Sequence, residues 1–215
     1  MVDPKLVEPD GEIPAGMKPD ARESWPPREL IDSYLGPFDF EFRPGEHTDL
    51  PSDDEAVKAA ARRFRDVLGR FCSGVTVVTA MSGETPIGMT CQSFSSVSLN
   101  PPLVMFIPAR TSRAWPLMQR AGRFCVNFLA ADQTDLSDVM ASRGVDKFAG
   151  VGWRPSEATG SPLLDDSLGY VDCTIQAVHE AGDHYVVIGR VQDLALGDDR
   201  APLLFFQGRY HTTGS

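Results

Sequence analysis

The sequence predicts a mainly β fold, a closed and largely antiparallel barrel with short peripheral helices, preceded by an extended N-terminal arm. Three observations predict it. Apolar, β-branched segments recur after residue 73 without regular alternation with helices, which is typical of antiparallel architectures. Helical spacing is confined to short stretches. Nine of the 17 prolines lie in residues 1–60, where they exclude any long helix. We therefore divide the chain into an acidic, proline-rich arm, residues 1–51, and a barrel domain, residues 52–215.

The arm carries a short aromatic pattern. Phe38, Phe40 and Phe42 alternate with acidic residues, and this alternation places three rings on one face of an extended segment. Two interpretations stay open: a disordered tail with exposed aromatic side chains, or an ordered arm that packs on the barrel or on a second subunit. We favour the ordered arm and expect these rings to be buried.

A helix begins the barrel domain. Ser52 and Glu55 form a capping box, in which a hydroxyl and a carboxylate accept hydrogen bonds from free N–H groups of the first turn. Apolar side chains follow at helical spacing and predict a helix that ends near residues 69–73 with one face packed. This apolar stripe consists of Val57, Ala60, Ala61, Phe64, Val67, Leu68 and Phe71.

The rest of the domain is predominantly β. Two short helices are expected at residues 112–121 and 133–142, and residues 143–165 are expected to form a loop-rich excursion. The expected strands, in chain order, are 74–79, 87–98, 101–107, 123–129, 168–179, 185–196 and 203–210.

The negative charge belongs mainly to the arm. The formal net charge is −10, but residues 1–60 hold 15 acidic and 6 basic side chains, whereas residues 61–215 hold 15 and 14. A nearly neutral barrel lacks the basic surface that nucleic-acid binding requires, so we expect no nucleic-acid partner. Its arginines are nevertheless free to receive phosphorylated cofactors.

The remaining composition points to an intracellular protein without a metal. No apolar run is long enough to span a membrane, and the N-terminal residues lack an apolar signal region. Four widely separated cysteines predict reduced thiols and a cytoplasmic location. His179 and His184 have no cysteine or carboxylate pattern around them that would complete a metal site.

One segment is too polar for a dry barrel interior. Residues 90–98 carry six uncharged polar side chains, which offer donors and acceptors without fixed charge and suit a planar heteroaromatic ligand. Gly88 would allow a ligand or a second backbone to approach closely. The alternative is an edge strand whose hydroxyls face water. The six side chains belong to Thr90, Gln92, Ser93, Ser95, Ser96 and Ser98.

An anion site is expected one strand later. Ser112 lies at the expected start of a helix between Arg110 and Arg113, and free N–H groups, the helix dipole and guanidinium donors all favour a phosphate. Together with the polar strand, this predicts a ligand with a flat head and a phosphate tail, a description that flavin mononucleotide (FMN) fits.

Several motifs resemble the flavin-reductase-like, FMN-binding split-barrel family, and especially the reductase components of two-component flavin monooxygenases that act in steroid degradation. The resemblance runs from about residue 58 to residue 212. The motifs that carry it, given by their residue ranges, are 71–79, 88–104, 122–129, 146–148, 182–184 and 208–210.

The resemblance implies a split β-barrel that forms a homodimer, with the flavin near the subunit interface. It implies that residues of one strand edge the isoalloxazine and ribityl chain, that a following segment continues the pocket wall, that a serine and an arginine hold the phosphate, and that a phenylalanine packs near the ring. In that order these residues are Pro86, Ile87, Gly88, Met89, Thr90, Gln92 and Ser93; Ile107, Pro108 and Ala109; Ser112 and Arg113; and Phe148.

The same resemblance places His184 on the nicotinamide side as the candidate catalytic residue. A histidine there can position the carboxamide or assist protonation of reduced flavin; the alternative is a hairpin histidine bonded to Asp183. Arg209 and Tyr210 are candidate contacts of the pyridine nucleotide, although Tyr210 could instead only close the barrel.

One departure from the family pattern concerns the helix after the Val-Asn strand. Family members carry an Arg-Phe pair where this chain has Val139 and Met140. The loss of that cation leaves open whether the flavin is FMN or flavin adenine dinucleotide (FAD).

The resulting prediction is a flavin reductase that uses NADH, or NADPH, and passes reduced flavin to a separate monooxygenase component. Two alternatives stay open: a flavin carrier or docking protein with little reductase activity, and a split-barrel oxidoreductase that acts directly on an organic substrate.

Overall fold

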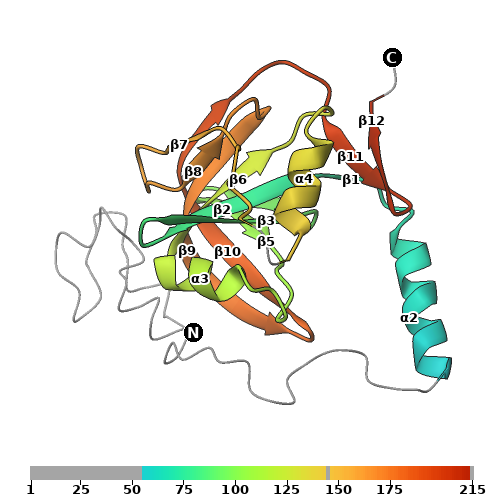
Figure 1. Cartoon of the computed structure of the whole chain (residues 1–215). Helices are drawn as coiled ribbons and strands as arrows, with labels where there is room; N and C mark the ends of the chain where they lie inside the picture. Colours follow the sequence, from blue (N-terminus) through green and yellow to red (C-terminus); the bar gives the residue numbers. More distant parts are fainter. Residues whose placement is uncertain (1–54, 144–145, 214–215) are drawn as a thin grey trace, which may run out of the picture.

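A computed structural model describes residues 55–143 and 146–213. The arm, its three phenylalanines and Ser52 lie outside the described residues. The structure confirms a mainly β fold with few short helices (Figure 1). The helices are α2 (Glu55–Leu68), α3 (Trp115–Ala121) and α4 (Thr134–Ala141). The strands are β1 (Ser73–Gly74), β2 (Thr76–Ser82), β3 (Thr85–Cys91), β4 (Ser95–Leu99), β5 (Pro102–Phe106), β6 (Arg123–Phe128), β7 (Trp153–Pro155), β8 (Pro162–Leu164), β9 (Gly169–Ala181), β10 (His184–Leu196), β11 (Leu203–Phe206) and β12 (Arg209–Thr212).

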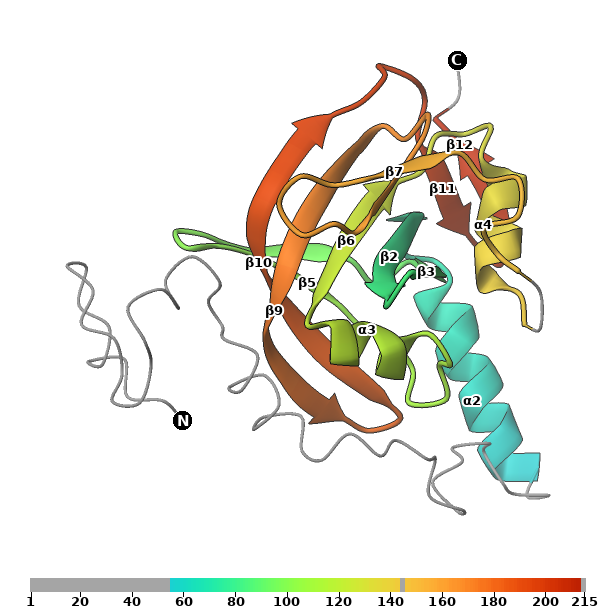
Figure 2. The same cartoon turned by 60° about the vertical axis from the view of Figure 1, so that its left-hand side comes forward.

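The main sheet is a curved, antiparallel layer of seven strands in the order β3-β2-β6-β9-β10-β5-β4. Figure 2 shows the long β9–β10 hairpin bending around the barrel. Since β3 and β4 are the two end strands, the barrel is open between them, and the prediction of a closed barrel from the residues alone is wrong. A three-stranded sheet, β1-β11-β12, and the small β7–β8 hairpin complete the fold.

Apolar side chains fill the barrel in two clusters. The larger one lies between the main sheet and α3, where Trp115 of the helix packs edge-on against Phe106, which in turn contacts Phe124. The smaller one joins β2, α4 and β11 around Leu129 and Met140. These two clusters hold β3 and α4 in fixed positions, and the candidate site is built on both elements.

The apolar stripe of the first helix is not packed as expected. Phe64, Val67, Leu68 and Phe71 are 64%, 61%, 54% and 80% exposed. In Figure 1, α2 stands apart from the barrel, and its C-terminal end is held by a hydrogen bond from the backbone N–H of Gln207 to the carbonyl of Gly69. The pattern correctly predicts the helix, but no other described element covers its apolar face.

Three expected elements have different boundaries. Residues 87–98 form β3 and β4, separated by a turn after Cys91. Residues 203–210 form most of the β11–β12 hairpin, because Gln207 and Gly208 adopt positive φ values of 50° and 75°, as a tight hairpin turn requires. The helix expected from residue 112 begins at Trp115, since Pro116 lacks an N–H and fits only its first turn.

Candidate functional site

β3 is the end strand of the main sheet, so one side of its backbone has no neighbouring strand. Its Thr90 hydroxyl donates a hydrogen bond of 2.5 Å to the carbonyl of Ser137 in α4. A Cβ atom at Gly88 would lie 2.7 Å from the Sδ of Met140 and 3.4 Å from the ring of Phe148. The close approach that Gly88 permits is made on this face by Met140 and Phe148, so a ligand at this residue would approach along the unpaired edge of the strand.

The segment after α4 closes over the same strand. Asp146 accepts a hydrogen bond of 3.1 Å from the backbone N–H of Phe148, which sets the turn. Phe148 packs edge-on against Trp153, with ring centroids 6.1 Å apart. Lys147 lies between Asp146 and Phe148 in the sequence, and its Nζ donates to the carbonyls of Gly88 at 3.1 Å and Met140 at 2.6 Å.

Lys147 is a candidate site residue that the sequence pattern does not single out. The motif of residues 146–148 predicts only its phenylalanine near the flavin. Burial lowers the pKa of the Lys147 ammonium from its ordinary value. The signal available in the sequence was that residues 61–215 hold only this one lysine.

The connection between β3 and β4 contacts the segment that follows β5. The Ser93 hydroxyl accepts from the backbone N–H of Ile107 at 3.0 Å and donates to its carbonyl at 3.1 Å. The carbonyl of Pro108 accepts from the N–H of Tyr185, and Ala109 forms a β-bridge with His184. The structure thus brings the expected pocket wall, residues 107–109, beside the expected nicotinamide residue.

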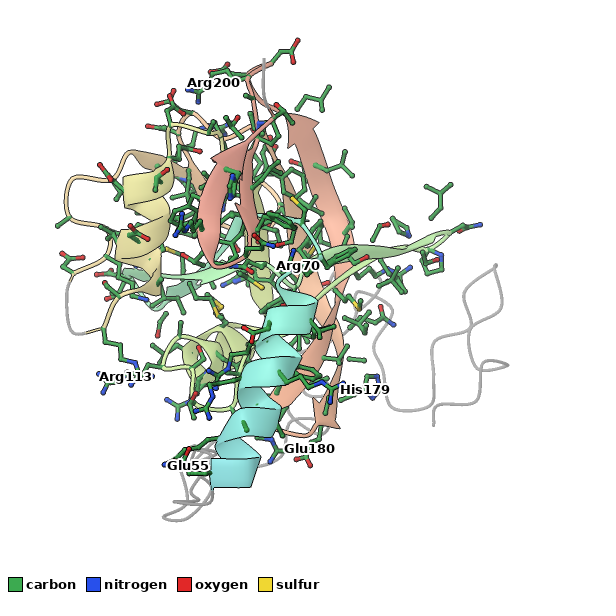
Figure 3. The ribbon with its side chains drawn as sticks, turned by 90° about the vertical axis from the view of Figure 1, so that its right-hand side faces the viewer. Glu55, Arg70, Arg113, His179, Glu180 and Arg200 are labelled. Carbon is green, nitrogen blue, oxygen red and sulfur yellow. The ribbon has the colours of Figure 1, made fainter. Side chains whose placement is uncertain are left out.

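Ser112 connects this segment to β3 and α3. Its hydroxyl accepts from the backbone N–H of Trp115 at 3.2 Å and lies 3.7 Å from the Sδ of Met89. Arg113 is exposed and, in Figure 3, projects from the outside of the molecule. The expected phosphate residues therefore lie next to the expected ring-binding strand.

Arg110, which is expected beside the anion site, has partners within the chain. Its guanidinium forms an ion pair with Glu180 at 3.0 Å and lies over the ring of Tyr185, 5.1 Å from the ring centroid. The carboxylate and the ring hold this cation toward the β9–β10 hairpin. Of the two flanking arginines, Arg113 is the one with no ion pair in the described part of the chain, and it is the better candidate for a phosphate.

His184 begins β10 at the rim of the site, and its side chain is 41% exposed. Its Nδ1 lies 2.7 Å from Oδ1 of Asp183, and this hydrogen bond lowers the pKa of the aspartate. The carboxylate orients the ring, while Nε2 has no hydrogen-bond partner in the part of the chain that the structure describes. Orientation by Asp183 and a role toward a ligand are therefore compatible.

Three expected site residues have other surroundings. Gln92 is exposed and lines an apolar groove of about 350 Å³ together with Phe71 and Phe94. Arg209 is exposed on β12. The Tyr210 hydroxyl donates to Asp138 at 2.8 Å and bonds Ser137 at 2.9 Å, so this tyrosine closes the barrel against α4. Burial raises its pKa.

The departure at residues 139 and 140 has a clear structural consequence. Val139 is 37% exposed on α4, whereas Met140 is fully buried against Gly88. A cation at position 139 would lie at the surface beside the site, and in this chain that surface is apolar.

The described ranges 55–143 and 146–213 contain no group of three histidine, cysteine or acidic side chains that could hold a metal ion. No helix within them is long and apolar enough to cross a membrane.

Comparison with known proteins identifies the family. A model of the flavin reductase like domain family matches residues 68–214. The chain belongs to this family. The reductase subunit HsaB of a flavin-dependent monooxygenase from Mycobacterium tuberculosis (strain H37Rv) is 50% identical over 151 residues, which cover 69% of this chain and 80% of the relative. The NADH-dependent FMN reductase SmoA of Agrobacterium fabrum is 39% identical over 167 residues, 78% of this chain and 91% of the relative.

A solved structure agrees with this assignment. Nitrilotriacetate monooxygenase component B from Mycobacterium thermoresistibile superposes with a TM-score of 0.71 at 47% identity, covering 73% of this chain and 88% of that chain. The split-barrel fold and the enzyme class are confirmed: the chain is a flavin reductase of the type that serves two-component monooxygenases.

Proposed function

We propose that this flavin reductase binds FMN along the open edge of β3, reduces it with NADH and supplies the reduced flavin to a separate monooxygenase. The observation that carries the proposal is the surround of β3: a strand edge that no other described strand pairs, with the neutral hydroxyls of Thr90 and Ser93 nearby and the Lys147 ammonium on its Gly88 carbonyl. The name of SmoA supports FMN and NADH as its substrates. The name of HsaB supports a monooxygenase partner.

The residues present fit a flavin. Free backbone groups at a strand edge can bond the carbonyls and ring nitrogens of a planar heterocycle. In this proposal, residues 86–90 and 93 edge the ring system and ribityl chain, residues 107–109 form the wall, Ser112 and Arg113 hold the phosphate, and Phe148 flanks the ring. Gln92, Arg209 and Tyr210 have no role in it.

Catalysis then requires mainly alignment. FMN supplies the hydride acceptor at N5, and no paired-carboxylate chemistry is needed. The chain holds the wall beside His184, whose free Nε2 can bond the nicotinamide carboxamide and bring C4 to about 3–3.5 Å from the acceptor. Asp183 fixes the imidazole ring for this task.

We also propose a cytoplasmic homodimer in which α2 contributes to the interface. Large contiguous apolar patches on a protein surface mark interaction sites. The exposed apolar face of α2 is followed by the exposed Phe71, which lines the apolar groove of about 350 Å³ beside β6. A second copy of the chain is the occupant that covers the helix face and the groove together.

Steady-state oxidation of NADH with added FMN tests the proposal. We expect turnover with FMN to exceed turnover with FAD, because the exposed Val139 offers no cation to an adenylate, and NADH to be preferred over NADPH. Negligible NADH oxidation by protein that retains FMN would contradict the reductase and favour the carrier alternative.

A further inference from the structure

Lys147 is a half-buried cation beside the strand that is proposed to hold the flavin. Two of its three N–H donors bond the carbonyls of Gly88 and Met140. No carboxylate of residues 55–143 or 146–213 pairs with it. The ammonium thus has no acidic partner among these residues, and one of its donors has no acceptor among them at the edge of β3.

The nearby acidic side chains are engaged elsewhere. Asp146 accepts from the backbone N–H of Phe148, and Asp138 accepts from the hydroxyl of Tyr210. A partly desolvated ammonium without a counter-ion is costly in a protein unless a ligand or a function compensates for it. The position of Lys147 is therefore unexplained by ion pairing within the described part of the chain.

We propose that Lys147 stabilises the reduced flavin: its ammonium balances the negative charge that hydride transfer leaves on the ring system. This inference rests on the proposed binding of FMN along β3. Hydride transfer from NADH breaks the C4–H bond of nicotinamide and forms an N5–H bond, so that NAD⁺ is released and one negative charge remains on the flavin. A fixed cation near the ring favours the reduced state over the oxidised state.

The other cations near β3 are less suited to this role. Arg110 is paired with Glu180, and Arg113 is exposed next to Ser112, where a phosphate is expected. Lys147 alone bonds the backbone of the ring-binding strand at Gly88. The same bonds cap the last turn of α4 at Met140, so a purely structural role is the competing explanation.

Affinities for oxidised and for reduced FMN, the latter measured without oxygen, separate the two explanations. The variants are Lys147→Met, Lys147→Gln and Lys147→Arg, of which Gln keeps a donor but no charge. Lys58→Met, at an exposed lysine paired with Glu55 on α2, is the matched control.

We expect Lys147→Met and Lys147→Gln to weaken the binding of reduced FMN about tenfold more than that of oxidised FMN. This ratio corresponds to a lowering of the midpoint potential of bound flavin by about 30 mV for two electrons. Lys147→Arg and Lys58→Met should keep the wild-type ratio.

Equal losses of affinity for both redox states, or no loss, would overturn the role of Lys147 while leaving the proposed function intact. Failure of the wild-type protein to bind FMN in either state would instead refute the proposed function, and the inference with it. If Lys147→Met does not fold, Lys147→Gln provides the same comparison.

Discussion

Single residues fix the candidate site mainly by holding backbone groups. Ser93 bonds both backbone groups of Ile107, and Lys147 bonds the carbonyl of Gly88. Such side-chain-to-backbone bonds fix the position of a loop or a strand edge more firmly than packing alone. A hydrogen bond requires a defined distance and angle between donor and acceptor, whereas an apolar contact does not. His184 differs from these residues, because its ring is oriented by Asp183 but keeps one free nitrogen.

Replacing His184 tests its role toward the nicotinamide. We expect His184→Asn to raise the KM for NADH about tenfold, the effect of losing roughly one good hydrogen bond, with the affinity for oxidised FMN unchanged. The pKa of Asp183, which His184 holds below its ordinary value, should rise in this variant, so that the aspartate protonates at a higher pH in an NMR titration.

His179→Asn is the matched control, since His179 is exposed on the same hairpin. An unchanged KM for NADH in His184→Asn, together with the expected rise in the pKa of Asp183, would exclude a contact of His184 with the nicotinamide and leave it only a structural role in the hairpin.

At the scale of elements, a buried carboxylate ties the β7–β8 hairpin to the barrel. Asp172 of β9 is fully buried, and it accepts from the hydroxyl of Thr159 at 2.6 Å and from its backbone N–H at 3.1 Å. The Thr159 hydroxyl also bonds Ser161 at 2.6 Å. This network holds the excursion that was expected only as loop, and Trp153 of its first strand supports Phe148.

The network predicts a specific pH dependence. Burial raises the pKa of Asp172 above its ordinary value, so the folded state binds this proton more tightly than the unfolded state. The stability from this group is therefore fully present below the unfolded pKa and is lost as the pH rises through the raised folded pKa. Urea unfolding followed against pH should show this decline in the wild type and not in Asp172→Asn.

Removal of the carboxyl group has a larger effect. We expect Asp172→Ala to lower the free energy of unfolding by about 1–3 kcal/mol, because donors of Thr159 lose a buried acceptor. Asp199→Asn, at an exposed aspartate, should leave both the stability and its pH dependence unchanged. If the free energy of unfolding depends on pH in the same way for the wild type and Asp172→Asn, the raised pKa of Asp172 makes no contribution to the stability.

At the scale of the whole molecule, the apolar face of α2 is exposed within the part of the chain that the structure describes. If α2 contributes to a dimer interface, Phe64→Glu should place a charge at the interface and weaken dimerisation at least about a hundredfold, since burial of an unpaired charge is costly. Light scattering should then give the mass of one chain where the wild type gives that of two.

Asp66→Lys is the control for that experiment, because its position lies almost opposite Phe64 around the helix. A monomeric wild type, or a dimeric Phe64→Glu variant, would exclude α2 from a dimer interface and leave its apolar face to another partner.

The sequence was sufficient where a pattern is local. Alternation and β-branched residues predicted most strands, and apolar spacing predicted α2. It was insufficient where the outcome depends on a distant partner. Three contacts join segments that are far apart in the chain. Arg110 pairs with Glu180, Met140 fills the space at Gly88, and Lys147 bonds the Gly88 carbonyl. The family motif marked Phe148 but could not show that the lysine before it bonds β3.

The claim on which the proposed mechanism and the role of Lys147 depend is that the flavin binds at the open edge of β3. A crystal structure of the protein with FMN tests it most directly. We predict that the ring system lies against Gly88–Thr90, with its phosphate at Ser112 and Arg113 and with the Lys147 ammonium within hydrogen-bond distance of the ring. A ring system bound instead in the apolar groove that Phe71 and Gln92 line would contradict the account.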